Sequence, residues 1–473
     1  MIFLRFRQIP HGLSPIAKAI LFRVRRRRQI KVADMESLAL STPSSRAGSI
    51  SCKTNLRSTG RLSVFVTVHF FRFRDMLMTT RRITRKIKVG STFIGGDSPV
   101  LIQTMAATKT HDFKATADSV NKLAENGAGL IRVAVDNSDD VNALAEIRKR
   151  TTANLSVDLQ ENFRLAERVA PYVDKIRYNP GHIHHLDPNT PWQKKVEYLV
   201  DVARKHDVAL RVGVNCGSID PTKLSANRSG DSVSTPSDGD LAKTESIFDP
   251  LLASALEHVD FLDSIDFTRY CVSIKSSDPQ TVVLVNRRFA ELRPDIPLHL
   301  GVTEAGAPPM GILKSRLALE QLLAEGIGET MRVSLTVEAD QKAEEIQAAR
   351  LILANVAAGS IIDPSTPLPK LDIISCPSCS RVQNGRFVEL ARQLVKATEF
   401  AKDYPFKIAT MGCRVNGPGE TDQADVGLWC GPDKVNLKDG STPIGSFGYD
   451  EVIEKAVALL KNKIEQFNAQ HKS

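Results

Sequence analysis

Three strings decide the fold: LIRVAV at residues 130–135, LSVDL at residues 155–159 and KIRYN at residues 175–179. Each is a short apolar run, which is typical of a buried strand. A polar or glycine-containing turn and a longer amphipathic stretch follow such a run, and this unit repeats from about residue 99. Because strands that alternate with helices form parallel sheets, the pattern predicts an α/β fold.

Outward from these strings, the same pattern gives eight strand candidates. They lie at residues 100–105, 130–135, 155–159, 175–179, 210–215, 271–275, 298–303 and 331–335. Amphipathic stretches that fit helices include residues 113–126, 141–150, 194–206 and 339–357. Eight strand–helix units match a (β/α)8 TIM barrel, which we assign to residues 78–358. A doubly wound open sheet is the alternative.

A second, smaller α/β domain is predicted for residues 371–473, after a Pro-containing linker at residues 359–370. Its expected strands are residues 371–375 and 406–411, and its expected helices are residues 387–402 and 449–467.

The first 77 residues hold the excess positive charge. The chain has 63 Lys and Arg and 54 Asp and Glu, a formal net charge of +9. Residues 1–77 hold 15 Lys and Arg and 3 Asp and Glu. Residues 78–473 therefore hold 48 Lys and Arg and 51 Asp and Glu, which is a net charge of −3. The predicted folded body therefore lacks the basic excess of a nucleic-acid-binding protein.

This leader has the composition of a transit peptide, with four consecutive arginines at residues 25–28. The alternative is a start codon set too early, with Met76 or Met78 as the true start, and we expect the leader to be disordered or dispensable. Its apolar run at residues 62–71 is about half the ~20 residues that a membrane helix requires. We therefore expect no membrane anchor.

Basic residues stand at the ends of five predicted strands: Arg132, Arg177, Arg211, Lys275 and Arg332. The loops at the carboxyl ends of barrel strands build TIM-barrel active sites, so these side chains should meet on one rim. Each alone could be a structural ion pair, but five on one rim favour a ligand with several negative oxygens, such as a diphosphate. Asn179, Asn215, Glu304 and Ser334 also stand at these strand ends.

A split motif near the C-terminal end carries different chemistry: CPSCSR at residues 376–381 and MGCRVNGPGE at residues 411–420. The Cys-x-x-Cys pair, Cys376 and Cys379, brings two thiolates within reach of one metal or cluster, and Cys413 can join them. With seven cysteines and no secretory signal, the chain is expected to work in a reducing compartment, the cytoplasm, and to use cysteines for metal binding.

Two residues are candidates for a fourth ligand. Cys430 would complete the four thiolates of a structural zinc or ordinary iron–sulfur site. Glu420 would instead supply one weakly held oxygen, which suits a cluster that opens to a substrate. Spacing does not choose between them, although Gly417 and Gly419 are expected to form a turn that brings Glu420 back toward the third cysteine.

The split motif resembles the signature of the 4-hydroxy-3-methylbut-2-enyl diphosphate synthase family, the iron–sulfur reductases of the methylerythritol phosphate route to isoprenoids. By this resemblance, which spans roughly residues 82–460, the chain has the two-domain bacterial form and lacks the extra domain of plant members. The resemblance implies a [4Fe–4S] cluster, with Cys430 as a bystander. Its implied ligands are Cys376, Cys379, Cys413 and Glu420.

The resemblance also implies the reaction, the reductive ring opening of 2-C-methyl-D-erythritol 2,4-cyclodiphosphate to 4-hydroxy-3-methylbut-2-enyl diphosphate. Water is lost and two electrons enter from flavodoxin or ferredoxin. The strings IRVAV, IRYNPG, LRVGVNCGS, VSIKSS, GVTEAG and MRVSL match the family's substrate-binding strings. The implied substrate contacts are Arg132, Arg177, Asn179, Arg211, Asn215, Lys275, Arg332 and Ser334, with Glu304 as an acid/base or hydroxyl contact.

In the family the cluster domain of one subunit closes over the barrel of the other, so we expect a homodimer. The resemblance further implies that Glu420 is catalytic, because it yields its position on the cluster to a substrate oxygen.

Some residues depart from the family pattern. Where the family commonly reads Asp-Ile-His-Phe, residues 158–161 read DLQE, which puts in doubt any proton transfer by a histidine at the position of Gln160. His182 stands where the family has Asn. Together with His184 and His185 it could be read as a metal cluster, but the neighbouring residues are those of an ordinary loop.

Other features are expected to be structural. The Ser-, Gly- and Asp-rich insert at residues 219–241 is predicted to be a disordered surface loop, and Cys216 and Cys271 to be packing residues. Two other protein classes remain alternatives: another iron–sulfur TIM-barrel enzyme, such as a pterin-type methyltransferase, and an interaction protein stapled by zinc.

Overall fold

The computed structural model describes residues 49–52, 66–69, 81–218, 241–413, 415 and 417–471. The chain divides into two units, residues 1–72 and 73–473. In the first unit, β1 (Ser49–Cys52) and β2 (Val66–His69) pair antiparallel. The rest of the predicted leader, with Met76 and Met78, and residues 219–240 of the predicted disordered loop lie outside the described residues.

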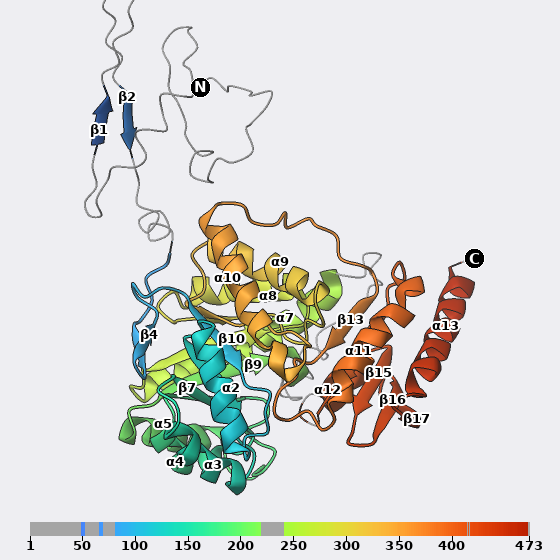
Figure 1. Ribbon diagram of the computed structural model, residues 1–473, viewed down its shortest axis with the longest axis horizontal. Helices are drawn as coiled ribbons and strands as arrows, with labels where there is room; N and C mark the ends of the chain where they lie inside the picture. The colour runs from blue at the N-terminus through green and yellow to red at the C-terminus, as the bar shows by residue number, and fades with distance from the viewer. Residues whose placement is uncertain are drawn as a thin grey trace, which may run out of the picture. The chain divides into compact units, whose positions relative to one another are not determined.

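Eight parallel strands form a barrel in the second unit (Figure 1). In chain order they are β5 (Leu101–Met105), β6 (Leu130–Ala134), β7 (Leu155–Gln160), β8 (Lys175–Tyr178), β9 (Ala209–Asn215), β10 (Tyr270–Lys275), β11 (His299–Leu300) and β12 (Thr330–Met331). The sheet runs β10-β9-β8-β7-β6-β5-β12-β11, and a parallel bridge between Val272 and Leu298 joins its two edges. Every strand overlaps a predicted range, and the joined edges exclude the open-sheet alternative.

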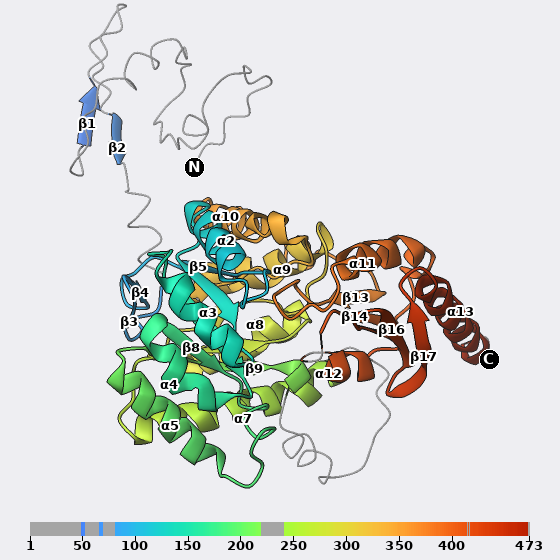
Figure 2. The same ribbon diagram turned by 60° about the horizontal axis from the view of Figure 1, so that its bottom comes forward.

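Helices cover the outside of the barrel (Figure 2). They are α2 (Phe113–Glu125), α3 (Ser138–Arg148), α4 (Ala166–Val169), α5 (Trp192–Lys205), α7 (Leu241–Ser264), α8 (Pro279–Leu292), α9 (Met310–Ala324) and α10 (Ala343–Ala357). Helix α2 buries Thr116, Val120 and Leu123 at helical spacing, and Asp112 caps it by accepting a bond from the backbone of Ala115. Within the described residues, no helix has the length and apolar character needed to span a membrane.

A hairpin that the sequence did not predict packs against the start of the barrel strands. It consists of β3 (Ile87–Val89) and β4 (Thr92–Ile94), which pair antiparallel. Its buried apolar side chains form one cluster with Leu130 and Ala209, which are the first residues of β6 and β9. Because the hairpin covers the amino ends of the strands, the opposite end is the one available for a site.

The second domain contains a five-stranded mixed sheet. Its strands, in spatial order, are β13 (Asp372–Ser375), β14 (Lys407–Met411), β15 (Val426–Cys430), β16 (Lys434–Asp439) and β17 (Thr442–Gly448). The first three are parallel and the last two pairings are antiparallel. The helices are α11 (Arg386–Ala397), α12 (Gly417–Asp422) and α13 (Val452–Gln470). The first two strands and the helices α11 and α13 match the prediction, whereas β15, β16 and β17 were not predicted.

Candidate active site

One pocket lies where the carboxyl ends of the barrel strands meet the second domain. Its barrel side is lined by Met105, Arg132, Asp158, Gln160, Arg177, Arg211, Asn215, Lys275, Thr303, Glu304, Arg332 and Ser334. Its second-domain side is lined by Cys376, Pro377, Cys379, Arg381, Cys413 and Val415. The five predicted cations and the three predicted cysteines therefore face the same space.

Asn179, a predicted substrate contact, is not among the residues that line the pocket. Asn179 is 1% exposed, and its amide nitrogen donates to Oε1 of Gln160 at 3.4 Å. Gln160 itself lines the pocket and donates to Asp158 at 3.3 Å. Asn179 is therefore connected to the pocket through Gln160, the residue at which this chain departs from the family pattern.

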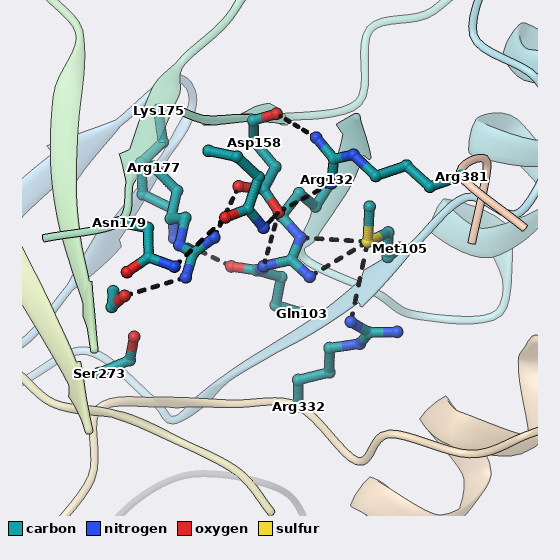
Figure 3. A network of polar contacts seen from close by, with 12 residues as sticks. Gln103, Met105, Arg132, Asp158, Lys175, Arg177, Asn179, Ser273, Arg332 and Arg381 are labelled. Carbon is teal, nitrogen blue, oxygen red and sulfur yellow. Dashed lines mark hydrogen bonds and ion pairs between the residues drawn. The ribbon is translucent and has the colours of Figure 1, made fainter. Parts of the chain in front are cut away.

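A carboxylate that the sequence did not single out organises the cations (Figure 3). Asp158 Oδ1 accepts a bond from Arg177 at 2.9 Å, and Oδ2 lies 3.7 Å from Arg132. Burial raises the pKa of Asp158, but the nearby guanidinium groups outweigh burial and hold it well below its usual range. Asp158 is therefore ionised and fixes the orientation of two predicted substrate contacts.

A second buried carboxylate comes from a helix. Glu345 of α10 accepts bonds from Arg332 at 3.2 and 3.3 Å and from Lys342 at 2.5 Å. Burial raises its pKa, but Arg332 and Lys342 lower it to about 2. No local pattern singles out this residue, because a carboxylate in an amphipathic helix is ordinarily exposed.

Positive charge exceeds negative charge on the barrel side. Arg211 is 2% exposed, and its Nε and Nη1 atoms have no hydrogen-bond partner among the described residues. Burial and the neighbouring arginines hold the pKa values of Arg211 and Lys275 well below their usual ranges. Buried cations that lack hydrogen-bond partners are stabilised by an anion with several oxygens.

Two glycines make room for these cations. A Cβ atom at Gly213 would lie 2.2 Å from Nε of Arg177, and one at Gly301 would lie 2.5 Å from Nζ of Lys275. Two residues of the pocket also have the left-handed backbone that L-residues rarely adopt, Gln160 with φ +50° and Glu304 with φ +47°. Strained backbone of this kind clusters at functional sites.

The thiol side of the pocket is built from turns. Cys376 follows β13 and Cys413 follows β14, so these parallel strands bring both to one edge of the sheet. The backbone N–H of Gly412 donates to Sγ of Cys376 at 3.2 Å. Burial, together with Cys413 and Cys379, raises the pKa of Cys376 well above its usual range. A bound metal cation would reverse this effect.

Glu420, the predicted fourth ligand, is buried but is not among the residues that line the pocket. It is 2% exposed, its Oε2 atom has no hydrogen-bond partner among the described residues, and Oε1 lies 3.9 Å from Sγ of Cys216. Burial and the nearby Glu304 raise its pKa to about 8. Cys216, predicted to be a packing residue, thus contacts a predicted ligand, whereas Cys271 belongs to the apolar cluster at the base of the barrel.

The turn predicted before Glu420 is wrong in its geometry. Residues 417–422 form the helix α12, and neither Gly417 nor Gly419 has a positive φ. The glycines are required for close contact instead. A Cβ atom at Gly417 would lie 2.7 Å from the ring of Trp429, and one at Gly419 would lie 2.6 Å from the carbonyl oxygen of Gly217.

The donor set fits a [4Fe–4S] cluster. Three thiols line one pocket, an N–H group donates to one of them, and Oε2 of the buried Glu420 has no hydrogen-bond partner within the described part of the chain. Among the described residues, no three His, Cys, Asp or Glu side chains are gathered as ligands of a single metal ion. A four-iron cluster does not require this, because each of its thiolates binds a different iron.

Cys430 and the three histidines lie elsewhere. Cys430 ends β15, is 1% exposed in the core of the second domain, and does not line the pocket. The rings of His182 and His185 are tilted by 32° with centroids 4.7 Å apart, and Nδ1 of His185 lies 3.1 Å from the carboxylate of Glu161. No observation in the described residues therefore favours a four-thiolate zinc site.

Comparisons with known proteins agree with this site. The family model described as GcpE TIM-barrel domain matches residues 84–350, and the one described as GcpE protein C-terminal domain matches residues 372–462. A 4-hydroxy-3-methylbut-2-en-1-yl diphosphate synthase (flavodoxin) of Rhodopirellula baltica is 53% identical over 380 residues, which cover 79% of this chain and 94% of that protein. The same-named protein of Nautilia profundicola is 36% identical over 393 residues, which cover 82% of this chain and 100% of that protein.

Among solved structures, a 7,8-dihydropteroate synthase from Vibrio fischeri aligns with a TM-score of 0.39 at 12% identity, over 60% of this chain and 100% of that chain. This likeness is too low to carry an argument. The matches of the two family models and of the relatives cover most of the chain. On these grounds the chain belongs to the GcpE family.

Proposed function

We propose that this chain catalyses the reductive ring opening of 2-C-methyl-D-erythritol 2,4-cyclodiphosphate to 4-hydroxy-3-methylbut-2-enyl diphosphate. One observation carries the proposal: five cations and three cysteines line a single pocket. The cations suit a diphosphate, and the cysteines suit an electron-transferring cluster. Two electrons and two protons enter, the ring opens, and one hydroxyl group leaves as water.

The barrel residues bind and orient the substrate. Among the residues that the structure describes, no carboxylate is a close ion-pair partner of Arg211 or Lys275, so we assign these two side chains to the diphosphate oxygens. Arg132, Arg177 and Arg332 are oriented by Asp158 and Glu345 and complete the cationic side. The polar side chains of Asn215 and Ser334 line the same space and suit the substrate's hydroxyl groups. Asn179 acts indirectly, because its amide donates a hydrogen bond to Gln160, which lines the pocket.

Glu304 stands between the two sides. It lines the pocket, and its backbone oxygen accepts a bond from Ser375 of the second domain at 3.2 Å. We assign its carboxyl group to a substrate hydroxyl, where it can hold or deliver the proton that the leaving water requires.

We propose that Cys376, Cys379, Cys413 and Glu420 hold a [4Fe–4S] cluster. When bound, the cluster would supply electrons and Lewis acidity to the carbon–oxygen bond that breaks. The three thiolates fix its position, and Glu420 is the one hard, exchangeable ligand. Glu420→Gln should retain the brown colour of the cluster and lose turnover about 100-fold, as measured with saturating substrate. Full turnover in this variant would remove the role assigned to Glu420.

The relatives' names support flavodoxin as the electron donor, with ferredoxin as the alternative. We also propose a cytoplasmic homodimer. In this structure the two domains of one chain line the pocket. Two chains could exchange second domains with the same contacts, because the linker at residues 359–370 is mostly exposed. Mixing Arg211→Met and Cys379→Ser chains should then restore part of the activity. No recovery in a mixed dimer would contradict the exchange.

The direct test of the function uses the full chain, reconstituted with iron and sulfide without oxygen. Adding the cyclodiphosphate should reoxidise a reduced viologen dye and yield the allylic diphosphate, which mass spectrometry identifies. A brown protein that binds the cyclodiphosphate but neither reoxidises the dye nor forms product would contradict the proposal. A colourless zinc protein would favour the interaction-protein alternative.

A further inference from the structure

A buried arginine of the second domain reaches into the barrel. Arg381 stands two positions after Cys379, and its side chain is 7% exposed. Its guanidinium group makes a fork on Asp136, with Nε 2.9 Å from Oδ1 and 3.0 Å from Oδ2, and with Nη2 2.7 Å from Oδ1. Asp136 follows β6, so this contact ties the Cys-x-x-Cys segment to a rim loop of the barrel.

The same guanidinium group also bonds to the carboxylate that organises the substrate cations. Nη2 of Arg381 donates to the carbonyl oxygen of Asp158 at 2.9 Å, and Nη1 donates to its Oδ2 at 3.4 Å. Figure 3 shows Arg381 approaching Asp158 from a separate part of the chain, while Arg132 and Arg177 hold the same carboxylate from within the barrel. We call Arg381, Asp136 and Asp158 the clasp.

The carboxylate of Asp158 is shared by Arg381, Arg132 and Arg177. The contacts of these three cations with it therefore compete. A diphosphate that binds Arg132 and Arg177 reduces their attraction for Asp158, which leaves this carboxylate more strongly bound to Arg381. By the same reasoning, closure of the clasp makes Arg132 and Arg177 more available to an anion. Thermodynamic linkage requires the two effects to be equal.

We propose that Arg381 is a positioning residue that seats the Cys-x-x-Cys segment over the barrel and couples this seating to diphosphate binding through Asp158, an inference that rests on the proposed function. Its main anchor, Asp136, does not line the pocket. Variants of Asp136 therefore change the clasp without removing a substrate contact.

The chain offers a matched control. Lys314 of the barrel lies 2.5 Å from Asp372 of the second domain. The side chains of Asp136 and Asp372 are 34% and 37% exposed, and each pairs with a cation of the other domain. Among the described residues, no direct bond connects the Lys314–Asp372 pair to a cation of the pocket. Asp136→Asn and Asp372→Asn thus make the same chemical change in two interdomain pairs, only one of which touches the substrate network.

The test measures binding of the cyclodiphosphate to the reconstituted full chain by titration calorimetry. Asp136→Asn should weaken binding about tenfold, within the usual range of coupling factors, and Asp372→Asn less than about twofold. Arg381→Met should match Asp136→Asn or exceed it, and the double variant should be no weaker than Arg381→Met, because both substitutions remove one contact. Arg381→Lys should recover only part of the affinity, because an ammonium group lacks the fork.

Hydrogen exchange of backbone amides tests the role of Arg381 independently of catalytic turnover. Exchange of the backbone amides in residues 376–382 should rise several-fold in Asp136→Asn without ligand, and the cyclodiphosphate should slow it in the wild type. Equal effects of Asp136→Asn and Asp372→Asn on binding and exchange would overturn the clasp. If the wild type bound no cyclodiphosphate, the proposed function would fail, and the exchange comparison alone would still decide whether Arg381 seats the segment.

Discussion

The two sides of the pocket gather ionisable groups of opposite charge, and on each side like charges are not balanced. On the barrel side, buried cations outnumber the carboxylates that face them, and burial holds the pKa values of Arg211 and Lys275 below their usual ranges. On the second-domain side, burial and like charges raise the pKa values of Cys376, which lines the pocket, and of Glu420, which lies outside the lining. The first imbalance suits an anionic substrate and the second suits a cationic cluster. The sign of the unbalanced charge thus identifies the ligand class of each side.

The two sides also differ in construction. Four of the five cations stand on parallel strands, where backbone pairing fixes their height and direction, and Arg332 directly follows β12. The cysteines stand in turns after β13 and β14, and their position over the barrel depends on contacts between domains such as Arg381 with Asp136. Substitutions on the barrel side should therefore alter substrate binding and leave the cluster intact. Those on the other side should alter the cluster first.

The largest effect is expected from Cys379→Ser. Loss of one thiolate should remove or destabilise the cluster, so the brown colour should fade and turnover should fall at least about 1,000-fold. Cys430→Ala is the matched control, because it removes a cysteine of the same domain that does not line the pocket. An equal loss of colour in Cys379→Ser and Cys430→Ala would contradict the assignment of Cys379, and not Cys430, as a cluster ligand.

Glu345→Gln tests the carboxylate support of the barrel side. Its pKa is about 2 in the folded chain against an ordinary value of 4.5, so the carboxylate stabilises the fold above pH 4.5, and this contribution is lost as pH falls toward 2. Denaturant unfolding at pH 7 should show a loss of about 3 kcal/mol in the variant. The difference between wild type and variant should shrink below about pH 4. A difference that is constant with pH would contradict the assigned ionisation.

Arg211→Met should separate binding from cluster assembly. Arg211 is a buried cation with no carboxylate partner in the described ranges, so its removal should raise KM for the cyclodiphosphate about 50-fold while iron content and colour stay at the wild-type level. Arg392→Met, at a partly exposed arginine of the second domain, is the control and should leave KM unchanged. An unchanged KM in Arg211→Met would mean that the substrate binds elsewhere.

The smallest effect is expected where the two sides touch. A Cβ atom at Gly217 would lie 2.3 Å from Oε1 of Glu420, so Gly217→Ala should displace this carboxylate and lower turnover about tenfold. Gly385→Ala is the control, because a Cβ atom there meets nothing within 4 Å. Equal turnover in the two variants would show that the position of Glu420 is not critical.

The sequence predicted the barrel well because its signal is local. Each strand is a run of apolar residues with a helix after it, and the cations stand at fixed places in these runs. The prediction did not include β15, β16 or β17, and the signal of β17 is weak. Residues 442–448 read TPIGSFG, with a proline and two glycines in a half-exposed strand. The hairpin at residues 87–94 was missed because its two strands have three residues each.

Within the site, the residues that were missed act through partners distant in the sequence. Asp158 contacts an arginine 223 residues away, and Glu345 holds Arg332 from a helix. Such pairings have no local signature, because either carboxylate could equally face solvent. The glycines before Glu420 illustrate the same limit. Gly417 and Gly419 read as turn residues in the sequence, but their role is close packing against Trp429 and Gly217, which only the tertiary structure reveals.

The central claim is that the cations and the cysteines form one active site. The most direct test is the electron paramagnetic resonance spectrum of the reduced, reconstituted chain with and without the cyclodiphosphate. We predict that the substrate changes the spectrum of the wild type, and that Arg211→Met requires about 50-fold more substrate for the same change. An unchanged spectrum in wild-type protein that calorimetry shows to be saturated with substrate would contradict a shared site.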